Sequence, residues 1–199
     1  MIHDDEQIIV METGGWIYDG YLKYEYDNLF LNYVTRLCNS LCIQTVLDVG
    51  CGCGFYVAKF REKGINASGF DANPYVEILS KRFIPENDAP CECVDLTSDF
   101  IVEDKFELTI CKDVLHYIPS VYIDRVLINL KKTTCRYLLV SLYNRGSKDK
   151  YANSYEAYDE IRAVALFYKY GFVLNEDLSF CLNNDLNSNQ KYFLFTLKD

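Results

Sequence analysis

The chain alternates between short apolar runs and longer stretches in which apolar residues recur every three or four positions. The short runs are typical of buried strands, and the longer stretches are typical of amphipathic helices. The predicted strands cover residues 44–49, 66–71, 89–94, 105–111, 136–142, 172–178 and 191–197. The predicted helices cover residues 21–42, 54–63, 74–83, 120–133 and 155–170. Such strand–helix alternation predicts a parallel sheet with right-handed crossovers.

The last two predicted strands depart from this alternation. Residues 183–190 are rich in asparagine, so we expect a loop there and a hairpin with one antiparallel strand. The predicted fold class is α/β, a three-layer sandwich with a mostly parallel seven-stranded sheet whose last strand is antiparallel. We expect residues 1–43 to form an N-terminal cover or lid segment, with its helix packed on the sheet or over the ligand edge. Residues 44–199 form the predicted main domain.

The segment 46–55 carries the most specific local pattern in the chain. An apolar run leads through Asp48 to three glycines, Gly50, Gly52 and Gly54, at alternate positions. This order predicts a buried strand, a tight turn and a helix N-terminus, where backbone N–H groups are unpaired. Glycine lets the backbone come close to a ligand, because a Cβ would intrude there. One glycine is ordinary at such a turn, whereas three after an acid favour a ligand site.

A second acid supports this interpretation. Asp71 ends the second predicted strand, about 20 positions beyond Gly50, where an acid can accept hydrogen bonds from ribose hydroxyls. The alternative is a turn or capping acid, and we favour the ribose role because strand, acid and spacing agree. Phe55 occupies the place where a dinucleotide fingerprint has a small residue, which disfavours a nicotinamide cofactor.

The pattern D-x-G-x-G-x-G over residues 48–54 resembles the first motif of the class I S-adenosylmethionine-dependent methyltransferases. The run D-V-L-H-Y-I-P over residues 113–119 resembles the fourth motif of the same family, and the resemblance covers roughly residues 44–199. It implies that S-adenosylmethionine is the cofactor and lies on the glycine loop. The implied cofactor contacts are Asp48, Gly50, Cys51, Gly52, Gly54, Asp71, Ala72, Asp95, Leu96, Cys111, Lys112 and Asp113.

Methyl transfer mainly requires alignment of donor and acceptor, but a hydroxyl acceptor is helped by a base that removes its proton. His116 is the leading candidate for this base, with Tyr18, Tyr21 or Tyr143 as orienting groups. A structural role for His116 and simple packing for Tyr18 and Tyr21 are the alternatives. For Asp95, a turn formed by Asp-Leu-Thr is the alternative to a cofactor contact.

A single small domain with a short cover favours a small-molecule acceptor, methylated at oxygen. Two other functions remain open: methylation of a protein or peptide side chain, and a non-catalytic partner protein that binds S-adenosylmethionine. A homodimer is also left open. The first alternative would use the acidic surface of the chain to meet a basic partner.

Net charge, hydropathy and cysteine spacing restrict the partners and metals that we expect. The 199 residues carry a net charge of -9, and such a chain repels phosphate backbones, so we expect no nucleic acid partner. The sequence has neither an apolar run of about 18 residues nor a secretory signal, so we expect no membrane partner and a cytoplasmic location. The two Cys-x-Cys pairs at 51/53 and 91/93 are too closely spaced for a typical zinc site, so no metal is expected.

Overall fold

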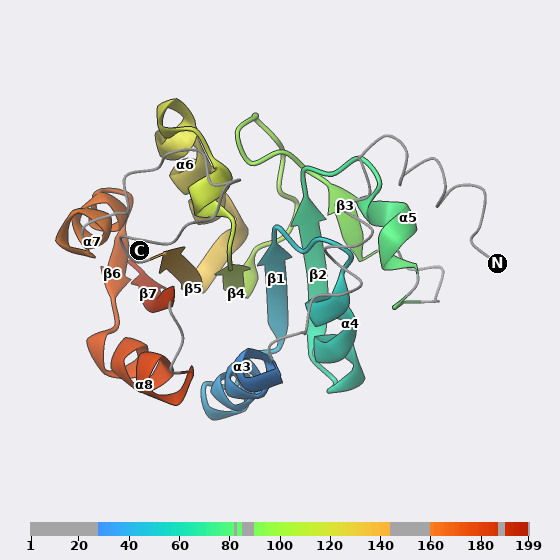
Figure 1. The fold of residues 1–199 in the computed structure, drawn as a ribbon, viewed down its shortest axis with the longest axis horizontal. Coiled ribbons are helices and arrows are strands. Elements are labelled where there is room, and N and C mark those ends of the chain that lie inside the picture. Colours follow the sequence, from blue (N-terminus) through green and yellow to red (C-terminus); the bar gives the residue numbers. More distant parts are fainter. Residues whose placement is uncertain (1–27, 82, 85–89, 144–159, 187–189, 199) are drawn as a thin grey trace.

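The computed structural model describes residues 28–81, 83–84, 90–143, 160–186 and 190–198. Within these residues seven strands form one sheet in the order β3-β2-β1-β4-β5-β7-β6 (Figure 1). The strands are β1 Thr45–Val49, β2 Asn66–Asp71, β3 Cys91–Cys93, β4 Phe106–Cys111, β5 Thr134–Tyr143, β6 Phe172–Leu174 and β7 Gln190–Leu197.

Helices connect most of these strands and cover the sheet. The α-helices are α3 Asn28–Ser40, α4 Phe55–Glu62, α5 Val76–Ser80, α6 Ile123–Thr133, α7 Glu160–Lys169 and α8 Glu176–Leu186. Two single 3-10 turns, η1 Leu115–Tyr117 and η2 Ser120–Tyr122, lie between β4 and α6.

The pairing of the strands confirms the predicted fold class. Strands β1 to β5 pair in parallel, and β7 is antiparallel to both of its neighbours, β5 and β6. The chain runs from β1 outward to β3 and then returns to β4 on the other side of β1. The topological switch point of the sheet therefore lies between β1 and β4, which is where ligands bind in open α/β sheets.

Both faces of the sheet are buried, which explains why apolar residues predominate in its central strands β1 and β4. On β1, Val46 belongs to the core under α3, α4 and α8, whereas Leu47 belongs to the core under α6 and α7. The helices thus form a layer on each side of the sheet (Figure 1).

Helix α3 packs on the sheet, which was one of the two places predicted for it. The ring of Phe30 is fully buried and contacts Tyr56 of α4 and Tyr192 of β7, with ring centroids 5.4 and 5.5 Å away. The Tyr33 hydroxyl donates a hydrogen bond to the carbonyl of Leu178 in α8. Residues 1–27, including Tyr18 and Tyr21, lie outside the described part of the chain.

The predicted helix 74–83 is wrong in its extent, because α5 covers only Val76–Ser80. Its N-cap is Tyr75, not Asn73. The side-chain carbonyl of Asn73 accepts a hydrogen bond from the Tyr75 amide at 3.0 Å. This local turn competes with helix formation, so the first helical turn begins later than the sequence suggests.

The predicted loop 183–190 is wrong over residues 183–186, and the predicted strand 172–178 is wrong beyond Leu174, where β6 ends. Residues 176–186 form α8, which connects β6 and β7 although these strands pair directly. Asn183 explains the difference, because its half-buried side-chain amide binds the backbone of β7. Its Oδ1 accepts a hydrogen bond from the Tyr192 amide, and its Nδ2 donates to the Tyr192 carbonyl, both at 2.8 Å. An asparagine that appeared to mark a loop therefore binds a helix to a strand.

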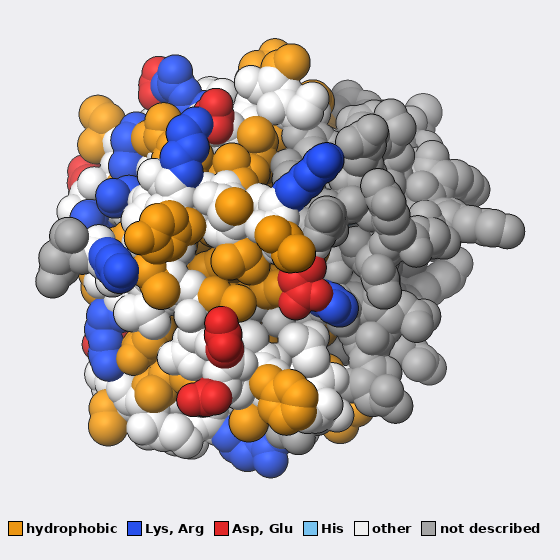
Figure 2. Space-filling view, turned by 90° about the vertical axis from the view of Figure 1, so that its left-hand side faces the viewer, with side chains coloured by type: hydrophobic (Ala, Val, Ile, Leu, Met, Phe, Trp, Pro, Cys, Tyr) orange, Lys and Arg blue, Asp and Glu red, His pale blue; other side chains and the backbone are white. Residues whose placement is uncertain are grey.

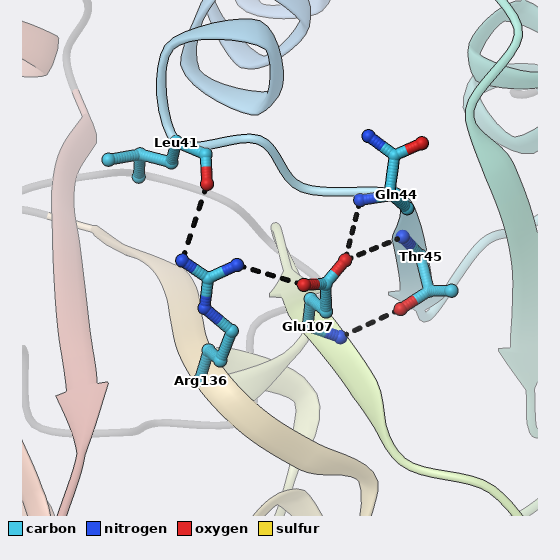
Figure 3. Close-up of polar contacts among 5 residues, drawn as sticks. All are labelled: Leu41, Gln44, Thr45, Glu107 and Arg136. Carbon is cyan, nitrogen blue, oxygen red and sulfur yellow. Dashed lines mark hydrogen bonds and ion pairs between the residues drawn. The ribbon is translucent and has the colours of Figure 1, made fainter.

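Glu107 and Arg136 form a polar clamp at the end of the sheet where the parallel strands begin (Figure 3). One oxygen of Glu107 accepts hydrogen bonds from the amides of Gln44 and Thr45, at 2.6 and 3.3 Å. Its other oxygen pairs with the Arg136 guanidinium at 2.8 Å, and Arg136 also donates to the carbonyl of Leu41. The clamp joins β4 and β5 to the chain between α3 and β1, at the edge opposite the glycine loop.

The side of the molecule that carries α7, β6 and α8 presents hydrophobic side chains between charged side chains of both signs (Figure 2). Ile161 and Tyr168 of α7 and Phe180 of α8 are the large exposed hydrophobic residues of these elements. Lys191 and Glu160 form an ion pair there. In the described ranges, no helix combines the length and the apolarity that a bilayer crossing requires.

Candidate active site

The candidate site begins with the turn that follows β1 at the switch point. Gly50, Gly52 and Gly54 all have left-handed backbones, with φ of 77, 58 and 75°. The amides of Gly50 and Cys51 both donate to the carbonyl of Phe70, at 2.6 and 3.0 Å, so the turn is tied to the end of β2. Side chains are strained in this conformation, which accounts for glycine at all three positions.

Two of the three glycines are also required by packing within the protein. A Cβ on Gly50 would lie 2.1 Å from Cγ2 of Val114, and a Cβ on Gly54 would lie 2.8 Å from Sγ of Cys91. The neighbours that exclude a side chain at these two positions are therefore protein atoms. The sequence predicted the tight glycine turn correctly. Close approach of a ligand, the reason given for the glycines, is not needed to explain Gly50 and Gly54.

Asp71, the last residue of β2, lies against the glycine turn. Its Oδ2 accepts a hydrogen bond from the Gly52 amide at 2.8 Å, and its Oδ1 accepts one from the Asn73 amide at 2.9 Å. Burial raises the pKa of this carboxyl above its usual value, and the two backbone hydrogen bonds oppose that rise. A carboxylate has about four acceptor sites, so Asp71 retains capacity for two further hydroxyl donors.

Asp48 lies on β1 beneath the turn and is almost completely buried. Burial raises the pKa of its carboxyl to about 7. The charge of Lys112 lowers this pKa and that of Asp71 raises it, both less than burial does. The predicted pair of acids thus lies together at the carboxyl edge, with one acid close to its titration point at neutral pH.

The chain after β4 forms a polar network next to this pair. The Lys112 ammonium contacts Oδ2 of Asp113 at 2.5 Å and lies 5.6 Å from the ring centroid of Phe30. Asp113 has a left-handed backbone, with φ of 60°, a conformation that costs a non-glycine residue roughly 1–2 kcal/mol. Its amide donates to Oγ of Ser141 at 2.8 Å, and Ser141 donates back to Oδ1 of Asp113.

Cys51 and Cys111 are buried core residues at this edge. Burial, together with the charges of Asp48 and Asp113, raises the pKa of the Cys111 thiol. The Cys51 thiol packs over Gly69 of β2, where a Cβ would lie 2.6 Å from its Sγ. The pKa of both thiols is raised, so neither is suited to nucleophilic chemistry, and their contact with a cofactor stays a prediction.

The residues predicted after β3 make mainly local contacts. Oδ1 of Asp95 accepts hydrogen bonds from the amide and the hydroxyl of Thr97, both at 2.8 Å, which is the turn considered as the alternative for this segment. Leu96 is buried in the core, and its carbonyl accepts a hydrogen bond from Asn129 of α6. Ala72, directly after β2, is exposed.

His116 lies in η1, a single 3-10 turn that precedes the predicted helix 120–133. The residue as a whole is half-buried, but both nitrogens of its ring are buried, and the ring lies 4.0 Å from that of Tyr117, centroid to centroid. Val114, two residues earlier, packs on Gly50, so this turn begins at the switch point. The structure therefore places His116 close in the chain to the predicted cofactor residues, while the role of its ring remains a prediction.

Ser141 is the polar residue of this edge that sequence reasoning missed. It occupies β5, its side chain is buried, and it binds Asp113, which lies 28 positions earlier in the chain. The only signal in the sequence was a serine within the apolar run from Tyr137 to Tyr143. In the described ranges, no group of three or more His, Cys, Asp and Glu side chains could hold a metal ion.

Comparison with known proteins supports the resemblance inferred from the two motifs. Residues 47–134 match the family model described as "Methyltransferase domain". The ubiquinone biosynthesis O-methyltransferase of Aliivibrio fischeri is 26% identical over 115 residues, which are 55% of this chain and 49% of that protein. The ubiquinone biosynthesis O-methyltransferase of Nitrosomonas europaea is 23% identical to this chain over 100 residues. The chain spans about half the length of the curated relatives it matches.

Solved structures share the whole fold at low sequence identity. A 1,6-didemethyltoxoflavin-N1-methyltransferase of Burkholderia thailandensis, with bound 1,6-didemethyltoxoflavin and S-adenosylhomocysteine, has a TM-score of 0.68 and 14% identity. That match covers 100% of this chain and 91% of the other. A TehB-like SAM-dependent methyltransferase of Corynebacterium glutamicum also has a TM-score of 0.68, with 17% identity, and the match covers 94% and 97% of the two chains.

Proposed function

Residues 47–134 of this chain match the family model for a methyltransferase domain, and on that premise we propose that the chain transfers a methyl group from S-adenosylmethionine to a small-molecule acceptor, at oxygen. The observation that carries the proposal is the glycine turn at the switch point, which is bound through Gly52 to Asp71. The match to O-methyltransferases supports oxygen as the methylated atom.

The chemistry of this edge fits the cofactor. S-adenosylmethionine supplies an activated methyl group on a sulfonium, together with ribose hydroxyls and a methionine ammonium that need acceptors. Asp71 retains acceptor capacity for the hydroxyls, and Asp48 is the acid that would hold the ammonium. The turn at residues 50–54 offers backbone rather than bulky side chains. Residues 111–113 and Ala72 would complete the contacts, and Asp95 and Leu96 would line the adenine side.

The protein's own contribution to the reaction is then alignment and proton removal. Holding donor and acceptor in line accelerates the reaction without further chemistry from the protein. His116 would take the proton of an acceptor hydroxyl, because it follows Asp113 and Val114 at the same edge. Tyr18 and Tyr21 are proposed to orient the acceptor from the N-terminal segment 1–43, and residues 44–199 are proposed to form the catalytic domain.

The direct test is release of S-adenosylhomocysteine in the presence of S-adenosylmethionine and a panel of phenols, aliphatic alcohols, amines, thiols and basic peptides. We expect turnover with a hydroxyl acceptor, and about a hundredfold lower kcat for His116→Ala with unchanged cofactor affinity. Turnover only with amines or thiols would overturn the oxygen assignment. Full activity of His116→Ala would remove His116 from the mechanism. Turnover only with basic peptides would instead support a protein acceptor.

A further inference from the structure

We propose that Ser141 is a positioning residue of the cofactor edge and that it acts by holding Asp113 in its left-handed backbone conformation. The inference rests on the proposed function, since it assigns a role within the same site. Ser141 belongs to β5, the strand next to β4, and neither of the two sequence motifs contains it.

The contacts between the two residues are reciprocal. The Asp113 amide donates to Oγ of Ser141 at 2.8 Å, and the same hydroxyl donates to Oδ1 of Asp113 at 3.1 Å. The Lys112 ammonium binds the other carboxylate oxygen of Asp113. The backbone amide and both carboxylate oxygens of Asp113 are therefore fixed at once. Because the Ser141 side chain is only 1% exposed, water cannot readily replace its hydroxyl.

The left-handed turn at Asp113 decides where the chain goes after β4. With φ of 60°, the backbone turns so that Val114 packs on Gly50, at a distance that no side chain on Gly50 would allow. Leu115 is buried next, and η1 with His116 follows. A continuous path of contacts thus runs from Ser141 through Asp113 and Val114 to the glycine turn across the switch point.

Backbone strain of this kind persists only where the surroundings over-determine the conformation. Without the Ser141 hydroxyl, the Asp113 amide loses its acceptor, and right-handed conformations become favoured at this residue. Val114 then leaves Gly50, and the turn that must lie within about 0.5 Å of its binding geometry is no longer supported. The expected result is weaker cofactor binding, not general unfolding.

The test is calorimetric binding of S-adenosylmethionine and S-adenosylhomocysteine to the full chain and to Ser141→Ala. Ser179→Ala is the matched control, because Ser179 is also a buried serine whose hydroxyl accepts from a β7 amide, that of Leu194, and donates to the Asn175 carbonyl. Ser179 lies on α8, away from the glycine turn. We expect Ser141→Ala to bind both ligands about tenfold more weakly and Ser179→Ala to bind them as the wild type does.

Measuring Ser141→Ala also in the Asp113→Gly variant separates a positioning role of Ser141 from the simple loss of a hydrogen bond. Asp113→Gly removes the cost of the left-handed backbone, so the hydroxyl of residue 141 has little left to enforce. We therefore expect Ser141→Ala to cost less than about threefold in affinity in the Asp113→Gly background. Thermal unfolding of each variant confirms that it is folded. Ser141→Cys, a weaker donor of similar size, replaces Ser141→Ala if the alanine variant does not fold.

The outcomes are distinguishable. Unchanged affinity for Ser141→Ala, or an equal loss in the wild-type and Asp113→Gly backgrounds, would overturn the positioning role while leaving the proposed function intact. An equal loss in Ser179→Ala would assign the effect to general stability and overturn it as well. Absence of S-adenosylmethionine binding to the wild-type chain would overturn the proposed function, and this inference with it.

Discussion

At the scale of single residues, Asp71 makes the contacts of a turn acid, and the ribose role that the sequence presents as the alternative stays a prediction compatible with them. Its oxygens bind the amides of Gly52 and Asn73, as a turn acid does, and they keep further acceptor capacity, as a ribose ligand needs. The spacing of an acid beyond the glycine run predicted its place at the edge. The spacing could not predict the bond to Gly52, because that bond depends on how the turn folds back on β2.

Asp71→Ala is predicted to weaken S-adenosylmethionine binding by more than about tenfold, because the Gly52 amide loses its acceptor and the ribose hydroxyls lose theirs. Asp71→Asn keeps one acceptor oxygen and should lose less. Calorimetry measures both, with Asp124→Ala as the control, since Asp124 is an exposed acid paired with Lys169 on the surface. Affinity equal to that of the control would remove Asp71 from the site.

Asp48 predicts a pH dependence of stability. Its folded-state pKa is raised to about 7 from an ordinary value of 3.8, mainly by burial. The folded protein therefore holds a proton that the unfolded chain releases, and this contribution to stability is present at low pH and is lost as the pH rises through about 7. The side chain that Asp48→Asn introduces cannot ionise. The free energy of unfolding of this variant, relative to that of the wild type, should therefore be higher at pH 8 than at pH 5.

Denaturant unfolding at pH 5, 6, 7 and 8 measures this difference for both chains, using intermediate points that bracket the pKa of about 7. Each pKa unit corresponds to about 1.4 kcal/mol, so the change across this range is at most a few kcal/mol. Comparison with Asp48→Asn isolates Asp48, together with its charge interaction with Asp71, from the other acids. Parallel pH profiles for the two proteins would contradict the assignment.

At the scale of elements, periodicity predicted the strands β1, β2 and β4 and the helices α4 and α6 close to their observed bounds. It failed at α8 for a reason that the residues make clear. Asparagine usually favours turns, but Asn183 is half-buried, and its side chain binds both the backbone amide and the backbone carbonyl of Tyr192 on β7. That tertiary contact overrides the local preference, and nothing near residue 183 in the sequence shows that a strand lies beside it.

The clamp between Glu107 and Arg136 predicts a change in stability without a change in binding. Glu107→Ala leaves the amides of Gln44 and Thr45 without their acceptor and should lower the free energy of unfolding by about 1–2 kcal/mol. Cofactor affinity should stay unchanged, because the clamp lies at the opposite edge of the sheet. The control is Glu103→Ala, at an exposed position on the preceding loop. A loss of cofactor affinity with an unchanged free energy of unfolding would contradict this prediction.

At the scale of the whole molecule, the proposed function depends on the reversal of strand order between β1 and β4. Two segments more than 60 positions apart, the glycine turn and the chain after β4, come into contact there through Gly50 and Val114. The sequence predicted both segments from separate motifs, and the parallel sheet predicted that they share an edge. Ser141 escaped prediction because its partner becomes its neighbour only when β5 pairs with β4.

The central claim is that this edge binds S-adenosylmethionine and not a dinucleotide. The most direct measurement is calorimetric titration of the wild-type chain with S-adenosylmethionine, S-adenosylhomocysteine and NAD under the same conditions. We predict saturable one-to-one binding of the first two ligands and none of NAD. Binding of NAD without binding of S-adenosylmethionine would contradict the account.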